Sequence, residues 1–576
     1  MRRIAKYLKP YLWQIAAVLA LVFVQAMTDL QLPDYMSQIV NQGVLAGDTG
    51  AILATGLKMI GITLLGSVCT IASGYLASRV ATAYARDLRA AVFDRVEQFS
   101  LTEFNKFSTA SLITRSTNDV QQVMMVMIIF LRMIVMAPIM AVGGILKAVE
   151  TNPSMTWIVA AAVACLFVLM GLLFTLGMPK MKIMQKLVDR LNLVTRENLT
   201  GMRVIRAFNT EHYEEQRLDK ANRDLTKTSL FVNRLMTIMQ PMMMLLMNAT
   251  TVLIIWVGAN AVGAGTMQVG DMMAFMQYAM QIMFSFLMVS MIFIMIPRAS
   301  VSAGRIADVL ETVPTITDPQ TPKTTAQANG LVEFRDVTFA YPGAEAPALE
   351  HISFTAKPGQ TTAIIGSTGS GKSTIVNLLP RFYDVTGGDI LIDGVSVKQM
   401  SQHALREKIG FVPQKGVLFT GTIRSNIAYG APGISEEEIY KAADIAQATE
   451  FISNLPEGLD TPIAQGGTNV SGGQKQRLSI ARALAKKPEI YVFDDSFSAL
   501  DFKTDAALRA ALKQNMGQAT CLLVAQRIST VVEAEQIIVL EEGKIAGIGT
   551  HKELMQTCPI YQEIARSQLS QEELGA

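Results

Sequence analysis

Six long runs of mostly apolar residues occupy the first half of the chain. They cover about residues 12–32, 52–76, 120–146, 157–178, 242–262 and 272–296. A helix that crosses the hydrocarbon core of a membrane needs about 20 such residues, so each run predicts a membrane-spanning helix. A single run of this kind could instead be the buried core helix of a soluble domain. Six runs whose connecting segments alternate in charge favour the membrane interpretation.

The connecting segments alternate in length and in basic residues. Segments 33–51, 147–156 and 263–271 are short and contain one basic residue, Lys147, whereas segments 77–119 and 179–241 are long and strongly basic. Lys and Arg remain on the cytoplasmic side of a membrane protein. We therefore predict a multi-pass protein of the cell membrane, most simply a bacterial plasma membrane, with both termini and both long segments in the cytoplasm.

Helical periodicity continues through the two long basic segments. Apolar residues recur at intervals of three and four in "YARDLRAAVFDRVEQF" and in "LVDRLNLVTRENLTGMRVIRAF", which is typical of amphipathic helices. The membrane helices are therefore expected to extend into the cytoplasm. Short turns near 99–108 and near 208–216 would join them there in pairs.

The membrane runs contain two features with more than one interpretation. Methionine stripes such as "VMMVMIIFLRMIVMAPIM" suit a surface that accepts many apolar shapes, but Met also simply fills packed and lipid-facing positions. Arg132 lies in the middle of the third run. A charge at this depth usually faces a cavity or a partner, which makes Arg132 a candidate for the substrate cavity, although its side chain could also reach toward the membrane surface.

Composition agrees with a membrane protein. The chain has 576 residues, a formal net charge of +2 and a mean hydropathy of +0.31, which is too apolar for an ordinary soluble protein of this length. The expected partners are the lipid bilayer and an amphiphilic small molecule, and no nucleic-acid partner is expected.

The second half of the chain has a different pattern. Residues 311–330, "ETVPTITDPQTPKTTAQANG", are polar, rich in Thr and Pro, and without periodicity, which predicts a linker. Short β-like runs such as "TTAIIG", "IYVFDD" and "ATCLLVAQ" then alternate with helical stretches. This alternation predicts a soluble α/β domain with a largely parallel sheet.

One motif in this half predicts a phosphate site. The motif "GSTGSGKST" follows a β-like run and precedes a helical stretch, and it comprises Gly366, Ser367, Thr368, Gly369, Ser370, Gly371, Lys372, Ser373 and Thr374. In a P-loop the backbone N–H groups surround the phosphates, the lysine reaches the β- and γ-phosphates, and the hydroxyl after it binds Mg²⁺. Asp494 closes the apolar run 490–493, and an aspartate in this place holds Mg²⁺ in P-loop proteins. The expected cofactors are therefore ATP and Mg²⁺.

A second phosphate-binding helix start follows the P-loop by about a hundred residues. Ser471, Gly472 and Gly473 precede the helical stretch "QKQRLSIARAL", and a helix N-terminus presents free N–H groups to an anion. One chain has no use for two such helix starts unless one of them serves another molecule.

Together these motifs resemble those of ATP-binding cassette (ABC) exporter half-transporters, and the resemblance covers nearly the whole chain. It rests on "SGGQ", which stands between the P-loop and "FDDSFSALD". It implies a six-helix all-α transmembrane domain at residues 1–310, the linker at 311–330 and an α/β P-loop nucleotide-binding domain at 331–576. The segment "FNTEHYEEQRL", near 208–218, resembles the second coupling element of this family.

The resemblance also implies residue roles and a partner. Tyr341 would stack on adenine, Gln414 would contact Mg²⁺ and sense the membrane domain, and Asp501 would lie at a dimer interface. Ser471, Gly472, Gly473 and Gln474 would form the signature motif. In this family two cassettes stack head to tail, so the signature of one chain completes the ATP site of the other. A second half-transporter is therefore an expected partner.

The chain departs from the family pattern in its catalytic positions. Asp495 stands where a glutamate is usual, and Gln526 stands where a histidine is usual. The loop before the signature also departs, since Gln465 stands where many relatives have glutamate. The loss of one methylene withdraws the carboxylate by about 1.5 Å, and a misplacement of about 1 Å costs on the order of a hundredfold in rate. The two changes at Asp495 and Gln526 predict a site that binds ATP and hydrolyses it weakly, beside an intact signature, as in one member of a heterodimeric exporter.

Three alternatives remain at this stage. Asp495 and Gln526 could be tolerated variants in an active homodimer, the chain could take up its substrate, or it could be an ATP-gated regulator that does not pump. The sequence favours amphiphilic drug-like or lipid-like cargo, but no motif in the membrane half names it.

Overall fold

The computed structural model describes residues 2–325 and 329–569, apart from the side chains of Arg2 and 290–294. Residues 326–328 of the predicted linker and residues 570–576 of the predicted nucleotide-binding domain lie outside the described residues, as does Met1. The chain divides into two compact units. One comprises the residues up to Val96 together with Ala110–Glu311, and the other comprises Glu97–Thr109 together with the chain from Thr312 onward.

The first unit consists of long helices. Six helices in its described residues are long and apolar enough to cross a membrane, and they are built on α1 (Leu12–Gln38), α2 (Thr49–Glu97), α5 (Val120–Thr151), α6 (Thr156–Thr200), α8 (Glu211–Gly263) and α9 (Val269–Glu311). Shorter helical segments flank them, namely η1 (Arg2–Tyr11), the π-helical η2 (Ile39–Val44) and η3 (Arg115–Asp119), α4 (Thr109–Thr114) and η4 (Pro153–Met155). The predicted fold class is confirmed for this half.

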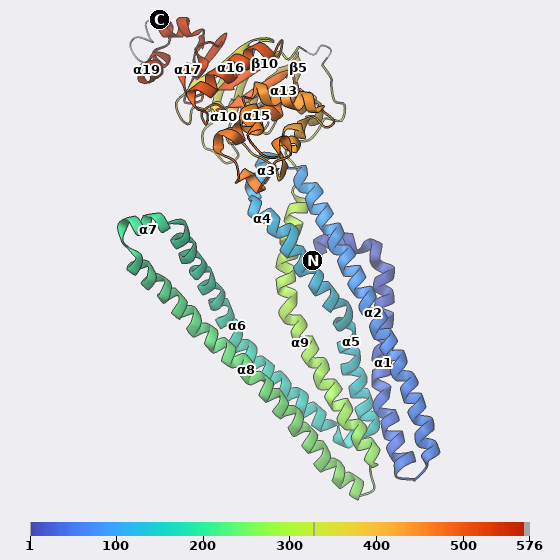
Figure 1. Ribbon diagram of the computed structural model, residues 1–576. Helices are drawn as coiled ribbons and strands as arrows, with labels where there is room; N and C mark the ends of the chain where they lie inside the picture. Colours follow the sequence, from blue (N-terminus) through green and yellow to red (C-terminus); the bar gives the residue numbers. More distant parts are fainter. Residues whose placement is uncertain (1, 326–328, 570–576) are drawn as a thin grey trace. The chain divides into compact units, whose positions relative to one another are not determined.

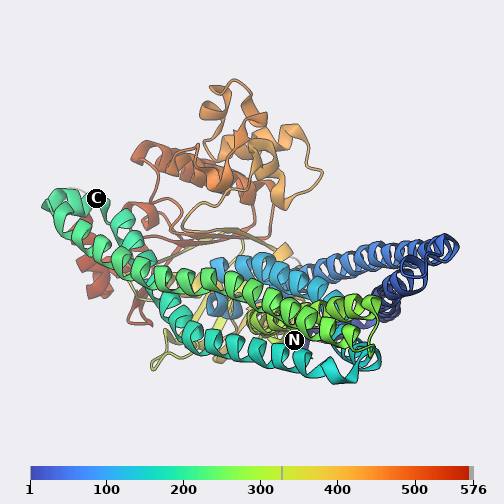
Figure 2. The ribbon, with the colours of Figure 1, turned by 90° about the horizontal axis from the view of Figure 1, so that it is seen from below.

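The helices are longer than a membrane requires. A helix of the length of α2, 49 residues, extends about 70 Å, against a hydrocarbon core of about 30 Å. Helix α6 packs along α8, α5 packs along α9, and α1 contacts both α5 and α9. Both views show α6 and α8 running side by side from their connection at α7 (Met202–Phe208) (Figures 1 and 2). The helices thus continue through the basic segments, as their periodicity predicts.

The connection between α6 and α8 differs from the expected turn near 208–216. Helix α6 ends at Gly201, the short helix α7 follows, and α8 already begins at Glu211. Asn209 has a φ of 58° and so ends α7 in the left-handed region. Glu211 and Glu214 in the first turn of α8 favour a helix start there. The segment 208–218, predicted as a coupling element, is therefore mostly the first two turns of α8.

The second unit contains two principal sheets. In the six-stranded sheet the order is β12-β11-β3-β10-β9-β6, with β3 (Thr361–Gly366), β6 (Ile409–Val412), β9 (Ile490–Asp494), β10 (Thr520–Val524), β11 (Gln536–Glu541) and β12 (Lys544–Gly549). Only β12 pairs antiparallel in this sheet. The middle strands β9 and β10 are buried at every residue, which explains their continuous apolar sequences.

The other sheet is antiparallel and was not expected from the sequence. Its order is β2-β1-β4-β5, with β1 (Val332–Phe339), β2 (Leu349–Ala356), β4 (Gly387–Ile392) and β5 (Val395–Ser396). A two-stranded pair joins β7 (Gly421–Thr422) to β8 (Pro462–Ile463). The α/β fold class predicted for this half is confirmed, with this second sheet as an addition.

Helices surround the sheets. They are α10 (Lys372–Leu378), α11 (Gln402–Glu407), α12 (Ile423–Ile427), α13 (Glu436–Ile445), α14 (Thr449–Ser453), α15 (Gly472–Ala485), α16 (Phe502–Asn515), α17 (Ile528–Val531), α18 (His551–Thr557) and α19 (Pro559–Gln568). The short helix α3 (Leu101–Phe107) belongs to the same unit, where the amide of Asn105 donates to the hydroxyl of Tyr383 at 3.2 Å. No helix or strand occurs in 312–325, and this segment holds to the unit through bonds such as Lys323 N to Gln399 O at 2.8 Å.

Candidate functional site

Four neighbouring parallel strands deliver the predicted site residues to one edge of the sheet. The P-loop follows β3, Gln526 follows β10, Asp494 ends β9, and Gln414 follows β6. In the register, Val524 lies opposite both Asp494 and Ile364. Because the carboxyl ends of parallel strands meet at the same edge, residues far apart in sequence come together here, which is where α/β sheets bind ligands.

Glycines shape the loop after β3. Gly369 and Gly371 have φ values of 87° and 101°, a region that favours glycine. A Cβ on Gly366 would lie 2.2 Å from the carbonyl oxygen of Leu540, so a side chain has no space there. The chain can therefore turn sharply from β3 into α10, with the backbone of Ser367 and Thr368 at the turn.

Lys372 lies folded back over this loop. Its Nζ donates to the carbonyl oxygens of Gly366 at 2.9 Å and Ser367 at 2.7 Å. Burial lowers the pKa of Lys372, and the charges of Asp495 and Asp494 oppose that effect. The ammonium group is thus held by two carbonyl oxygens of the loop, and it lies close enough to the carboxylates of Asp495 and Asp494 for their charges to act on its pKa.

The donor set expected for Mg²⁺ is assembled. The hydroxyl of Ser373 donates to Oδ1 of Asp494 at 2.8 Å. Hard oxygen ligands of this kind suit Mg²⁺, which binds through one or two protein groups and the phosphates of the nucleotide. Burial raises the pKa of Asp494, and the neighbouring charge of Asp495 adds to the rise. A cation at this place would favour the ionised carboxylate, so the two residues fit the metal.

The side chain of Asp495 contacts two other residues that the sequence predicted to be catalytic. Its Oδ2 accepts hydrogen bonds from Nε2 of Gln526 at 2.8 Å and from Nε2 of Gln414 at 3.1 Å. The residue is 7% exposed and has a φ of 46°. Burial raises the pKa of Asp495, while the hydrogen bonds lower it. Gln526 and Gln414, predicted separately from the sequence, therefore both donate to one carboxylate oxygen of Asp495.

One supporting residue at this site was missed by the sequence interpretation. Gln568, near the end of α19, donates to the carbonyl oxygen of Gln526 at 2.9 Å and accepts from the backbone N–H of Ile528 at 2.8 Å. These bonds fix the loop that carries Gln526. Gln568 follows Gln526 by 42 residues and lies in no motif, so only the packed fold connects the two.

Tyr341 stands beside the P-loop. Its hydroxyl is 3.0 Å from Oγ1 of Thr374, and its ring meets those of Phe339 and Tyr383 edge to face, at 4.9 and 5.4 Å between centroids. The side chain is 37% exposed. A ring fixed in this way offers an open face for stacking, and the role of adenine contact remains a prediction.

The signature residues form a separate group. Ser471 caps α15, where its Oγ accepts from the backbone N–H of Gln474 and the side chain of Gln474 accepts from the backbone N–H of Ser471 at 2.9 Å. Nothing lies within 4 Å of a Cβ built on Gly472. Asp501 caps α16 and lies close enough to Arg477 of α15 to affect its pKa, which burial lowers and this carboxylate raises.

No hydrogen bond or ion pair joins this group to the P-loop among the residues that the structure describes. The predicted residues thus fall into two sets. One set surrounds the P-loop, with Asp494, Asp495, Gln414, Gln526 and Tyr341, and the other is the exposed start of α15 with Asp501.

Two charged residues of the first unit have notable surroundings: Arg132, which the sequence interpretation singled out, and Asp34, which it did not. Arg132 of α5 is exposed, and its guanidinium lies 3.9 Å from a Cβ built on Gly74 of α2. Asp34, just beyond the first predicted span, accepts from the hydroxyl of Tyr278 at 2.6 Å and pairs with Lys147 at 3.1 Å. The position of Asp34, a charged residue directly after the apolar run 12–32, was the sequence feature that could have drawn attention to it.

Comparisons with known proteins agree with this arrangement. Residues 15–286 match the ABC transporter transmembrane region and residues 349–498 match the ABC transporter family. The chain is 43% identical to an uncharacterized ABC transporter ATP-binding protein of Mycobacterium tuberculosis, over 98% of this chain and 97% of that protein. It is 32% identical to an ATP-dependent lipid A-core flippase of Syntrophus aciditrophicus, over 90% of this chain and 86% of the flippase.

A solved structure extends the comparison to the fold. The chain matches the structure of a bacterial Atm1-family ABC exporter with ATP bound at a TM-score of 0.78 and 26% sequence identity, which covers 97% of this chain and 99% of that one. The matched regions include both the membrane helices and the strands that carry the P-loop. The chain belongs to the ABC transporter family, with an exporter-type membrane domain followed by an ATP-binding domain.

Proposed function

We propose that this chain is one half of an ATP-driven exporter of the cell membrane and that it pairs with a different half-transporter. Its P-loop site binds ATP with Mg²⁺ and hydrolyses it slowly, while its signature motif completes the faster site of the partner. The family assignment and the exporter fold support transport coupled to an ATPase. The pairing, the weak site and the cargo are the proposal.

The state of Asp495 is the observation that carries the proposal. A catalytic base must lie within hydrogen-bond reach of the attacking water. The carboxylate of Asp495 is one methylene shorter than the usual glutamate, and its Oδ2 is already engaged by the amides of Gln526 and Gln414. Gln526 has a neutral amide that cannot become cationic. ATP binding depends on other residues, so this site favours retention of ATP over turnover.

The exposed signature supports a partner. Ser471, Gly472 and Gly473 offer a hydroxyl and free N–H groups at the start of α15, and no hydrogen bond or ion pair links them to the chain's own P-loop within the described residues. When bound, Mg²⁺ supplies positive charge beside the phosphates. Lys372 positions those phosphates, and the start of α15 of a second chain would add the remaining donors.

The identity of the nucleotide bound to each chain, ATP or ADP, tests the pairing. The chain and the companion half that co-purifies with it from native membranes are incubated with Mg²⁺ and radiolabelled 8-azido-ATP and then photo-crosslinked. We expect mostly intact ATP on this chain and mostly ADP on the companion. Similar ADP fractions on both chains, or isolation of this chain only as a homodimer, would contradict the asymmetric proposal.

The proposed cargo is amphiphilic and mostly apolar, drug-like or lipid-like. The lipid A-core flippase among the relatives supports a lipid-like class, and the membrane half is rich in methionine, with only Met400, Met516 and Met555 beyond residue 331. We place both termini on the cytoplasmic side because the long basic segments are expected there.

Arg132 offers a test of cargo recognition. If its guanidinium contacts substrate, Arg132→Ala should reduce ATP-dependent transport of anionic dyes by about tenfold, as expected for the loss of one charged contact, and should change transport of neutral dyes little. Dye transport into inside-out vesicles measures both. Arg298→Ala, just beyond the predicted span 272–296, provides a control variant. Equal effects on anionic and neutral dyes would assign Arg132 a structural role.

A further inference from the structure

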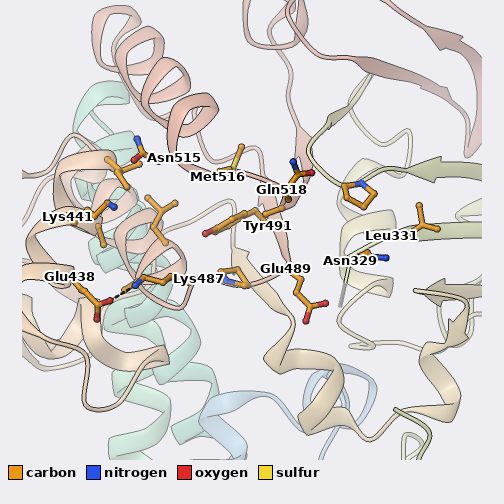
Figure 3. A pocket seen from close by; sticks show the side chains of 17 residues that line it. Asn329, Leu331, Glu438, Lys441, Lys487, Glu489, Tyr491, Asn515, Met516 and Gln518 are labelled. Carbon is orange, nitrogen blue, oxygen red and sulfur yellow. Dashed lines mark hydrogen bonds and ion pairs between the residues drawn. The ribbon is translucent and has the colours of Figure 1, made fainter. Parts of the chain in front are cut away.

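A cavity of about 670 Å³ lies in the second unit, at the edge of the six-stranded sheet opposite to the P-loop (Figure 3). Its lining includes Pro358, Glu489 and Gln518, which precede β3, β9 and β10. Since these strands are parallel, their starts share one edge and the P-loop lies beyond the other. The cavity is therefore separate from the proposed nucleotide site.

The cavity has the size and the mixed lining of a small-molecule site. Such sites have volumes of about 300–1,000 Å³, with apolar walls and a few polar groups. Helices α13, α15 and α16 contribute to one side, and apolar groups cover much of it, among them Ala442, Ile445, Leu484 and Met516. Among the described residues, the lining contains four charged side chains, Glu438, Lys441, Lys487 and Glu489.

Tyr491 of β9 places an unused donor at the centre. The residue is 6% exposed, and its ring stacks on that of Phe493 at 6.2 Å between centroids. Its hydroxyl has no hydrogen-bond partner within the described part of the chain, and its side chain extends into the cavity (Figure 3). Burial raises the pKa of Tyr491 to about 12, so the phenol stays protonated near neutral pH. The hydroxyl can therefore donate a hydrogen bond to an acceptor on a ligand in the cavity.

The charges of the lining leave one cation without a counterion. Glu438 forms an ion pair with Lys487 (Figure 3). Glu489 accepts from Nζ of Lys408 at 2.6 and 2.8 Å. Lys441 of α13 has no ion pair within the described residues, and it lies on the same side of the cavity as Lys487 and Asn515 (Figure 3). Lys408 also lies 3.9 Å from the carboxylate of Asp393, so Lys441 is the lining cation that no carboxylate pairs with among the described residues.

We propose that this cavity binds a small aromatic carboxylate. The carboxylate would accept from Lys441 and from the hydroxyl of Tyr491, and the ring would lie against Met516 and the neighbouring apolar groups, where a thioether favours aromatic contact. A cationic ligand would meet the uncompensated lysine, and a purely apolar ligand would leave the phenol without an acceptor. Binding here involves none of the residues assigned to ATP, so it can be measured without turnover.

Fluorine NMR with 4-(trifluoromethyl)benzoate tests the proposal on the full chain in lipid nanodiscs. Lys441→Gln should weaken binding about tenfold, and Tyr491→Phe should weaken it about threefold to tenfold, as expected for the loss of a charged or neutral hydrogen bond. Lys552→Gln, which changes an exposed lysine on α18, should leave binding unchanged. The uncharged amide of the probe should bind more weakly than the acid to the wild-type protein, and Lys441→Gln should change its binding less than it changes that of the acid.

Tyr491→Phe preserves the ring that packs in the sheet, so it separates loss of the hydroxyl from loss of folding. Equal binding of the acid to all four proteins would mean that the probe enters the lipid or another surface, and the proposal would be wrong. A stronger response to the amide than to the acid would also overturn it. None of these outcomes depends on the rate of ATP hydrolysis, so the exporter proposal is tested separately.

Discussion

Gly473→Asp in this chain is expected to abolish nearly all ATPase activity of the assembled pair, by about a hundredfold or more. Preorganised donors at a phosphoryl-transfer site are each worth a few kcal/mol, and an aspartate at the start of α15 would place a negative charge where the γ-phosphate of the partner's ATP is expected. The substitution should not disturb folding, because a Cβ on Gly473 would come no closer than 3.4 Å to a neighbour. An acidic residue in the first turn also favours a helix. Phosphate release by the purified pair is the measurement.

Three further variants of this chain distinguish the two ATP sites. Ser471→Ala should also remove most activity, although it also removes a helix cap worth about 1 kcal/mol, so Ser471→Thr, which retains a hydroxyl and a cap, is its matched control. Asp495→Asn should leave more than about half of the activity, because the site it alters contributes little turnover. Lys372→Ala should fall between, since ATP in the slow site still helps to hold the cassettes together.

The ranking of these variants decides the proposal. If Asp495→Asn were as damaging as Ser471→Ala, this chain's own P-loop site would be a main catalytic site, and the asymmetric assignment would be wrong. ATP binding to each variant, measured with a fluorescent nucleotide, separates loss of chemistry from loss of nucleotide.

The motifs of the site could be predicted from the sequence because each is local. A P-loop requires a strand, glycines, a lysine and a helix in succession, and all of these are contiguous at 361–378. The connection between motifs could not be predicted in the same way. That Gln414 and Gln526 share one oxygen of Asp495 depends on the order β6-β9-β10 in the sheet, and the support from Gln568 depends on where α19 packs.

The limits of the fold prediction have similar causes. The apolar membrane runs and the buried central strands have strong patterns, so their presence could be predicted. Strand β2 was missed because its pairing with β1 is irregular, so that Leu349 and Ile352 are both buried at a spacing of three instead of two. The connection after α6 was misplaced because the polar residues from 209 onward resemble a turn. Its actual ends are defined by Gly201 and by Asn209, which is in the left-handed region.

The chain on its own is expected to bind Mg²⁺ and ATP yet to hydrolyse ATP at least about a hundredfold more slowly than the assembled pair, since a misplacement of the catalytic group by about 1 Å costs that much. Any homodimer would contain two intact signatures, so slow turnover would trace to the residues around Asp495. The measurements are nucleotide binding and phosphate release by the purified chain in nanodiscs, both at saturating Mg²⁺ and ATP.

Restoring the usual residues should raise this low rate in steps. Asp495→Glu extends the carboxylate by one methylene toward the position of the attacking water, but Gln526 remains neutral and is held in place by Gln568, so recovery should be only partial, about tenfold. Asp495→Glu combined with Gln526→His should recover more, because a histidine can carry positive charge beside the γ-phosphate. Gln465→Glu, in the loop before the signature, changes neither of these groups and serves as the control. Hydrolysis by the unmodified chain alone at the rate of the pair would contradict this account, because Asp495 and Gln526 would then form a competent site as they stand.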